Sequence, residues 1–155
     1  MLEAKAQCES PKPQVIQDLF RSHGLRFTQK RASIYQTLAS MDSHPTAHEL
    51  LVAVKAHEPR ISLATVYNTL ESLSTTGLCR RIPDSTGSGP SRYDADVGPH
   101  VHVLISDGRV MDVPHDLSLK ILADLSPDTL VELERRLGVK VTEVDLKLIA
   151  NPIDA

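Results

Sequence analysis

The stretch SLATVYNTLESLS, residues 62–74, decides how the first half of this chain folds. Its first residue, Ser62, suits a helix N-cap. The apolar residues that follow recur at helical spacing and predict one buried stripe. The stripe consists of Leu63, Val66, Leu70 and Leu73. The opposite face is small and polar, which a helix that touches DNA bases requires, although ordinary amphipathic helices share this feature.

The segments on either side of this helix decide between those two interpretations. Three further helical patterns precede it, over residues 14–23, 29–40 and 47–57, and the last begins with a capping box of Thr46 and Glu49. Two short strand patterns follow it, 78–82 and 91–93, joined by the Pro/Gly-rich segment 83–90. Helices followed by a two-stranded ribbon indicate a winged helix.

The second half has a different pattern. Residues 100–105 and 109–113 predict a β-hairpin, Ser126-Pro127 opens a helix that ends at Gly138, and the aliphatic run 139–149 predicts a last strand. A unit of this size buries too little surface to be very stable alone, so we expect it to form a homodimer. The predicted class is α+β, with an N-terminal winged-helix DNA-binding domain followed by a small α/β dimerisation domain. The expected boundaries are 1–88, a hinge at 89–96, and 97–155.

Composition narrows the function classes. Residues 1–83 carry 10 Lys and Arg against 7 Asp and Glu, whereas 84–155 carry 7 against 13, so a mildly basic half precedes an acidic one. This distribution suits a phosphate-binding module joined to a cation-binding one. No apolar run is long enough for a membrane span and the N-terminus lacks a secretory signal, so we expect a cytoplasmic protein without a membrane partner. The two cysteines, Cys8 and Cys79, form no CxxC zinc motif.

The most informative local motif is His100-Val101-His102. In a strand, residues two apart point to one face with Cα atoms about 6.6 Å apart, so both imidazoles are suited to one metal ion. If the hairpin turns about Asp107, His102 lies directly opposite Asp112, and the carboxylate joins the two rings. Asp94 and His44 lie in loops that are able to approach this group, and His115 is an alternative ligand.

Several motifs together resemble the ferric uptake regulator (Fur) family. They are ISLATVYNTLESLSTTGL, GLRFTQKR, SHPTAHEL, and RYD followed by HVH and a hairpin ending in MDV. The similarity covers about residues 15–150. It implies a dimeric winged-helix repressor that binds a double-stranded DNA operator when a divalent metal is bound.

Carried over by position, the resemblance places the family's regulatory metal site on a set that includes the motif above. The implied ligands are His44, Asp94, His100, His102 and Asp112. In having aspartate rather than glutamate at position 94, the chain resembles the peroxide-responsive branch of the family. We therefore expect one regulatory metal per subunit, with Fe²⁺ or Mn²⁺ favoured and Zn²⁺ as an alternative, since imidazole and carboxylate ligands suit all three.

Two departures from the family pattern concern other metal sites. The hairpin that carries a CxxC in most members reads Ile105-Ser106-Asp107-Gly108 here, and none occurs near the C-terminus. We therefore expect no structural zinc. Pro99 and Val101 replace the interleaved ligands of a further site found in iron-uptake members, so we expect that site to be absent too.

The candidate DNA contacts divide by their expected target. Arg26, Gln29 and Arg31 are assigned to phosphates, and Thr65, Tyr67 and Asn68 to the groove, with Arg80 and Arg81 as helpers from the wing. The alternatives are an iron- or zinc-uptake regulator on the same scaffold, or a winged-helix dimer that has lost its metal response. A metallo-hydrolase is disfavoured because no separate general base or substrate pocket is evident, so we expect a regulator rather than an enzyme.

Overall fold

The computed structural model describes residues 13–41, 43–84, 87–142 and 144–152. The chain divides into two compact units, residues 1–97 and 98–155. Of the residues singled out above, Cys8 lies outside the described part. Within the described residues, no helix is both long and apolar enough to cross a membrane.

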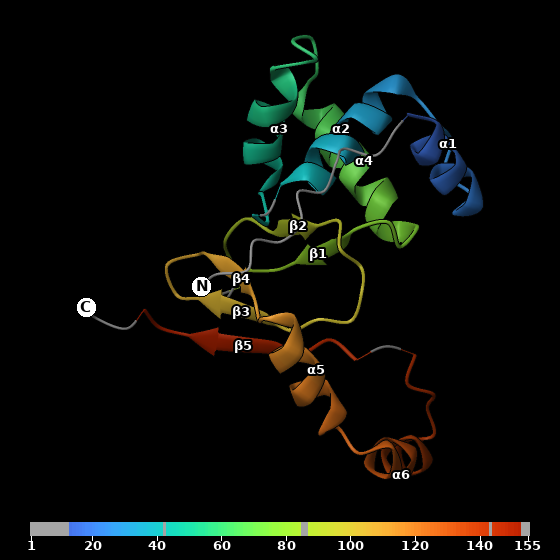
Figure 1. Ribbon diagram of the computed structural model, residues 1–155, viewed down its shortest axis with the longest axis vertical. Coiled ribbons are helices and arrows are strands. Elements are labelled where there is room, and N and C mark those ends of the chain that lie inside the picture. Colours follow the sequence, from blue (N-terminus) through green and yellow to red (C-terminus); the bar gives the residue numbers. More distant parts are fainter. Residues whose placement is uncertain (1–12, 42, 85–86, 143, 153–155) are drawn as a thin grey trace. The chain divides into compact units, whose positions relative to one another are not determined.

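In its described residues, the first unit is a four-helix cluster followed by a two-stranded ribbon (Figure 1). Its elements are α1 (Pro13–Ser22), α2 (Gln29–Ser40), α3 (Ala47–Lys55), α4 (Leu63–Thr75), β1 (Arg80–Ile82) and β2 (Arg92–Asp94). The ribbon is antiparallel, with Arg81 opposite Tyr93. This is the predicted winged-helix order, and β2 lies within the segment predicted as a hinge.

Side-chain caps explain where these helices begin. The hydroxyls of Thr28 and Ser62 accept hydrogen bonds from the backbone N–H groups of Arg31 and Thr65, and Thr46 forms the predicted capping box with Glu49. The stripe predicted on α4 is buried: Val66, Leu70 and Leu73 are fully inaccessible and Leu63 is partly buried. The first unit therefore has a core of its own, which fixes the outward face of α4.

The described part of the second unit combines a three-stranded sheet with two helices. Its elements are β3 (His102–Ile105), β4 (Val110–Asp112), α5 (His115–Ala123), α6 (Pro127–Leu137) and β5 (Lys147–Ala150). Strand β3 is central, pairing antiparallel with β4 and parallel with β5. The register places His102 opposite Asp112, as the hairpin pattern predicted.

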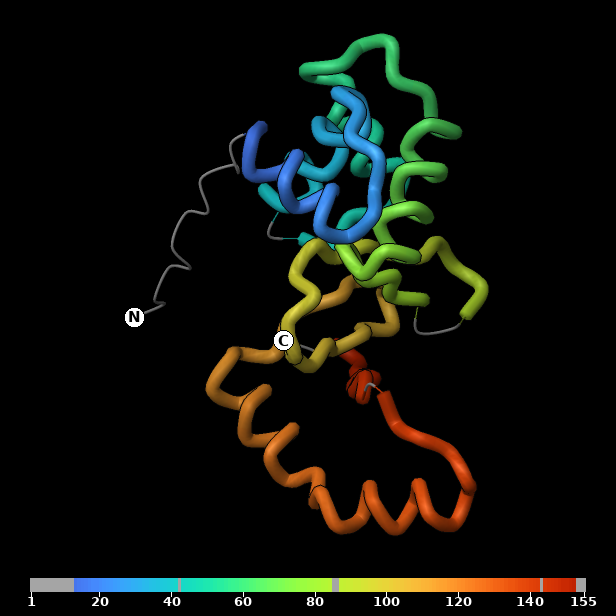
Figure 2. The backbone as a smooth tube through the Cα atoms, turned by 90° about the vertical axis from the view of Figure 1, so that its right-hand side faces the viewer, coloured from blue at the N-terminus to red at the C-terminus, as the bar shows by residue number. Residues whose placement is uncertain are grey.

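The last strand is shorter than predicted. The aliphatic run begins at Val139, but β5 starts only at Lys147. Before it, Glu134 of α6 accepts hydrogen bonds from Lys140 Nζ and the Val141 backbone, which hold this part of the run against the helix and out of the sheet. Figure 2 shows the chain running out along α5, turning into α6 and returning to β5.

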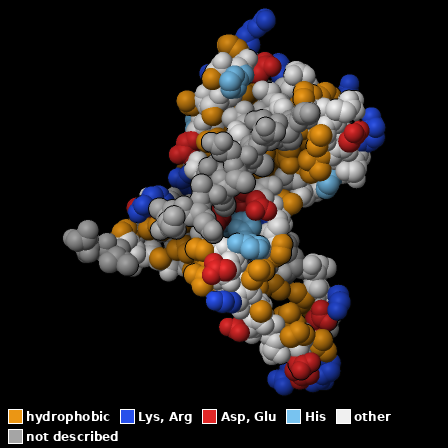
Figure 3. Space-filling model, in the orientation of Figure 1, with side chains coloured by type: hydrophobic (Ala, Val, Ile, Leu, Met, Phe, Trp, Pro, Cys, Tyr) orange, Lys and Arg blue, Asp and Glu red, His pale blue; other side chains and the backbone are white. Residues whose placement is uncertain are grey.

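Helix α6 covers none of the core of its own unit. None of its residues is buried, although its polar and apolar side chains segregate to different faces. Val131 is 61% exposed and Leu137 66% exposed, and Ile149 of β5 is 74% exposed. Hydrophobic side chains are visible along the second unit in Figure 3. Exposed apolar surface on this scale is typical of a surface that another protein chain covers.

Candidate metal centre and DNA-contacting surface

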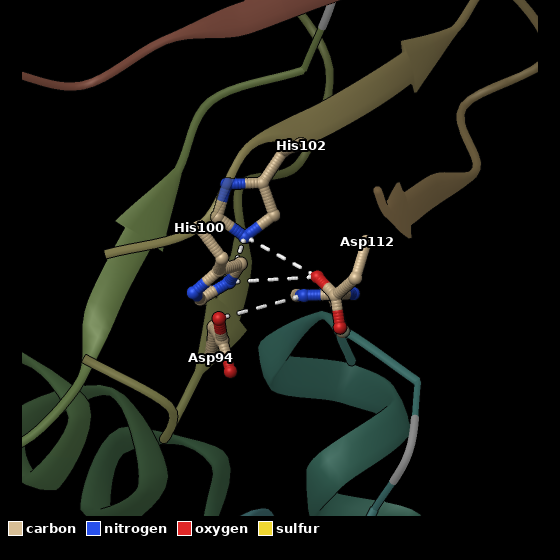
Figure 4. A group of neighbouring side chains, drawn as sticks. Asp94, His100, His102 and Asp112 are labelled. Carbon is tan, nitrogen blue, oxygen red and sulfur yellow. Dashed lines mark hydrogen bonds and ion pairs between the residues drawn. The ribbon is translucent and has the colours of Figure 1, made fainter. Parts of the chain in front are cut away.

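The second unit brings three of the predicted ligands together (Figure 4). The Nε2 atoms of His100 and His102 lie 2.9 Å apart. The Oδ1 atom of Asp112 lies 3.5 Å from the first nitrogen and 3.6 Å from the second. His102 and Asp112 lie directly opposite each other and form a non-hydrogen-bonded pair of the antiparallel ladder. In such a pair the side chains are close, so sheet geometry itself brings the imidazole and the carboxylate together.

These distances fit ligands of one metal ion. Two ligand atoms that each lie about 2.1 Å from an ion are about 3.0 Å apart at a right angle and about 3.4 Å apart at a tetrahedral angle. The three measured separations fall close to this range. Two imidazole nitrogens and a carboxylate oxygen form a borderline-to-hard donor set, which suits Fe²⁺, Mn²⁺ and Zn²⁺.

The ring of His100 is held in the tautomer that metal binding needs. Its Nδ1 lies 2.9 Å from the carbonyl oxygen of Gly98. A carbonyl only accepts hydrogen bonds, so Nδ1 carries the proton and Nε2 keeps its lone pair. A hydrogen bond of this kind, made by the ring nitrogen that faces away from the ion, orients a metal-binding histidine.

The first unit brings together the other two predicted ligands. His44 Nε2 lies 3.5 Å from Asp94 Oδ2, and the His44 side chain is buried. The other carboxylate oxygen of Asp94 accepts a hydrogen bond from the Asp96 backbone at 2.8 Å, which fixes how the group presents Oδ2. The five predicted ligands thus form two groups, one in each unit, and each group is ordered locally.

Strand β2 holds the loop that carries His44. The Tyr93 N–H donates to the Pro45 carbonyl at 2.9 Å. Arg92 Nη1 donates to the His44 carbonyl at 2.7 Å and to Glu49 Oε2 at 3.1 Å. Arg92 therefore ties His44 to the strand that carries Asp94. Sequence reasoning did not assign this role to Arg92, and its place two residues before Asp94 is the only signal that pointed to it.

Glu49 connects this network to the start of α3. The Thr46 N–H donates to Glu49 Oε2 at 2.7 Å. This bond, and next to it the charge of Arg92, lowers the pKa of the Glu49 carboxyl below its ordinary value. The carboxylate is consequently ionised at neutral pH, where it both caps α3 and orients the guanidinium that holds His44.

The predicted base-contacting residues lie on the outer side of α4. Tyr67 is 44% exposed and Asn68 is exposed. Thr65 is half-buried, and its hydroxyl lies 2.8 Å from that of the Ser62 cap. Tyr67 and Asn68 are therefore available to a partner, whereas Thr65 is partly engaged within the helix start.

The predicted phosphate contacts lie before and at the start of α2. Arg26 and Gln29 are exposed. Arg31 is half-buried, and its Nη1 donates to the Arg26 carbonyl at 2.5 Å. Arg31 thus has a structural role in the loop between α1 and α2, besides any contact with a phosphate.

Fold and side chains together define a two-unit winged-helix protein whose second unit carries an imidazole–carboxylate cluster. Comparison with known families is more specific. The ferric uptake regulator family matches residues 22–148, and this chain belongs to that family.

Individual relatives agree with this assignment. The chain is 34% identical to the peroxide-responsive repressor PerR of Staphylococcus saprophyticus over 93 residues, and 33% identical to PerR of Staphylococcus aureus over a stretch of the same length. Each match covers 59% of this chain and 62% of the relative. The chain thus spans less than two thirds of the length of these relatives.

Solved structures share the fold. The ferric uptake regulator from Pseudomonas aeruginosa with manganese aligns with a TM-score of 0.66 and 25% identity, covering 88% of this chain and 97% of that one. The peroxide stress regulator of Campylobacter jejuni aligns with a TM-score of 0.63 and 23% identity, covering 91% and 96%.

Proposed function

We propose that this chain is a metal-dependent, DNA-binding transcriptional regulator that acts as a homodimer. The observation that carries the proposal is the cluster of His100, His102 and Asp112, whose donor atoms are spaced as ligands of one ion. The exposed polar face of α4 supplies the DNA-contacting surface. The relatives are named as repressors and regulators, not as enzymes, which supports this class over a metallo-hydrolase.

One ion per subunit, bound by the group of the second unit together with His44 and Asp94, would link the metal to DNA binding. The proposed ion is held by residues of both units, so it restricts how the units are oriented. In a dimer, that orientation sets the separation of the two α4 helices, which must match half-sites along the duplex. Metal thereby changes DNA affinity without contacting DNA.

The exposed apolar residues of α6 and β5 support the homodimer. No residue of α6 is buried and Ile149 of β5 is 74% exposed, and a second copy of the chain would bury these side chains against an identical surface. With neither CxxC motif present, we propose that this dimer is held by apolar packing and needs no structural zinc.

The experiment is a DNA-binding assay with a duplex from the region upstream of the protein's own gene. We expect binding in the presence of Mn²⁺ or Fe²⁺ and a large loss of binding after chelation. Equal binding with and without metal would contradict metal dependence. No binding under any condition would contradict either the choice of operator or the proposal that the protein is a DNA-binding regulator.

We further propose that the bound metal is Fe²⁺ or Mn²⁺ and that the iron form responds to peroxide. Support comes from Asp94 and from relatives named as peroxide-responsive repressors. A bound ferrous ion would supply the chemistry that breaks the O–O bond of hydrogen peroxide. Overall, one peroxide oxygen would be inserted into a C–H bond of a neighbouring imidazole, the other would leave as water, and the two electrons would come from the ring. Among the described residues, Cys79 offers no equivalent route, because its thiol is buried and burial raises its pKa.

Peptide mass spectrometry after peroxide treatment tests this finer proposal. We expect a one-oxygen gain on a peptide containing His44 or His100, only in the iron form and in parallel with loss of DNA binding. Loss of binding with unmodified histidines would favour plain iron, manganese or zinc sensing instead.

A further inference from the structure

A single buried hydroxyl lies between the two chain segments that carry the ligands of the second unit. Ser118 is fully inaccessible, and it is the only buried residue of α5. Its Oγ accepts a hydrogen bond from the Val101 backbone N–H at 3.2 Å and donates one to the Val113 carbonyl at 3.1 Å. Val101 separates the two histidines in the chain, and Val113 directly follows Asp112.

The two hydrogen bonds of Ser118 differ in how far apart in the chain their partners lie. Donation from a helical serine to a carbonyl a few residues earlier is common and stays within the local chain. The bond from Val101 is different because it joins α5 to a backbone group 17 residues earlier, directly before β3. It fixes the backbone at the point from which both histidine rings depart.

The register explains why the hydroxyl fits there. Val101 lies opposite Val113, one position beyond the pair formed by His102 and Asp112. The Val113 N–H donates to the Val101 carbonyl at 2.8 Å, which marks this as a hydrogen-bonded position of the ladder. At such positions the reciprocal bond normally runs directly between the strands. Such a bond would join the Val101 N–H to the Val113 carbonyl. Here both of these groups bond to the Ser118 hydroxyl instead, so the hydroxyl is inserted into the ladder.

We propose that Ser118 is a positioning residue of the metal centre, which sets the distance between the two histidines and the Asp112 carboxylate without touching the ion. This inference rests on the proposed function, because it assumes that the cluster binds metal. Val101 and Val113 are both buried, so water does not easily replace the hydroxyl. Loss of the hydroxyl lets the end of the ladder close or open, and either change moves the ligands of β3 relative to Asp112.

The test compares Mn²⁺ binding by the full-length chain and its Ser118 variants. We expect Ser118→Ala to weaken Mn²⁺ binding by about tenfold, the low end for loss of an outer-shell partner. We expect Ser118→Thr, which keeps the hydroxyl, to restore most of the affinity. The Co²⁺ absorption spectrum should change in Ser118→Ala and return in Ser118→Thr, because it reports ligand geometry rather than stability.

Two control variants separate positioning from general stability. Ser106→Ala removes an exposed hydroxyl from the turn of the same hairpin, and Ile105→Val loosens the buried end of β3. Both should bind Mn²⁺ like the wild type. The role of Ser118 is contradicted if Ser118→Ala binds Mn²⁺ with wild-type affinity, or if Ile105→Val weakens binding equally at the same loss of thermal stability.

A measurement on the unaltered chain covers the case in which Ser118→Ala does not fold. In the metal-free wild type, the Val101 amide should exchange with deuterium as slowly as the sheet amides of β3, and rapid exchange would overturn the proposal. Failure of the wild type to bind Mn²⁺ would overturn both the proposed function and this role. Normal wild-type binding that Ser118→Ala retains would overturn this role alone.

Discussion

The imidazole Nε2 atoms of His100 and His102 lie 2.9 Å apart, although only His102 belongs to a strand. The sequence pattern predicted both rings on one strand face. Instead β3 begins at His102, and the ring of His100 is held by the carbonyl of Gly98. The position of this imidazole pair therefore depends on sheet geometry for one ring and on a local hydrogen bond for the other.

Replacement of Arg92 tests how the first unit orders its ligand group. Arg92→Ala removes the bond to the His44 carbonyl, so we expect a more mobile 43–46 loop and Mn²⁺ affinity reduced by about tenfold. Arg81→Ala, an exposed arginine on the neighbouring strand, is the matched control and should leave affinity unchanged. Hydrogen exchange of the loop and Mn²⁺ titration check this, and wild-type affinity in Arg92→Ala would show that the guanidinium has no part in the site.

The lowered pKa of Glu49 predicts a pH-dependent contribution to stability. A carboxyl whose pKa is lower in the folded than in the unfolded chain stabilises the fold above its unfolded pKa, and this contribution disappears as the pH falls through the folded pKa. In Glu49→Gln the amide still accepts the Thr46 bond but carries no charge. We therefore expect the variant to be less stable than the wild type at pH 7 and equally stable at acidic pH, as measured by urea unfolding. A stability difference independent of pH would contradict the assigned charge.

The outer face of α4 is tested by its two exposed side chains. We expect Tyr67→Ala and Asn68→Ala each to weaken specific operator binding by about 1–3 kcal/mol, the usual range for a good base contact. Mn²⁺ affinity and dimerisation should not change. Val15→Ala, at an exposed site on α1, serves as the control in the same gel-shift assay. Unchanged operator binding in both α4 variants would refute the assignment of this helix.

The exposed face of α6 predicts a dimer that survives chelation. We expect wild-type protein to sediment as a dimer before and after prolonged treatment with EDTA, because in our proposal apolar packing rather than zinc holds the dimer. Leu137→Asp should shift it toward monomer, whereas Val52→Asp, an equally exposed site on α3, should not. A monomer after chelation alone would show that a structural metal is present after all.

Local patterns were sufficient for most of the fold. The helix caps at Thr28, Thr46 and Ser62 and the stripe on α4 are encoded by residues close together in the chain, and all are present in the structure. The opposition of His102 and Asp112 followed from turn position and strand period alone. The length of β5 did not, because Glu134 holds Lys140 and Val141 through contacts that no periodicity encodes.

The supporting residues of the metal centre escaped prediction for a related reason. Arg92 and Ser118 act through hydrogen bonds to backbone groups 48 and 17 residues away. A serine within a helix has no sequence signature that distinguishes an exposed hydroxyl from one inserted in a strand ladder. Such roles become visible only when the partner strand has been placed.

We propose that one ion is bound by side chains from both units, and a Mn²⁺ titration by calorimetry decides whether it is. We expect one Mn²⁺ per chain in the wild type, and a large loss of affinity in His44→Ala as well as in His102→Ala. His115→Ala, an exposed histidine near Asp112, should keep wild-type affinity and thereby exclude it as a ligand. Wild-type affinity in His44→Ala, together with loss of binding in His102→Ala, would contradict the claim, because the ion would then be held by the second unit alone.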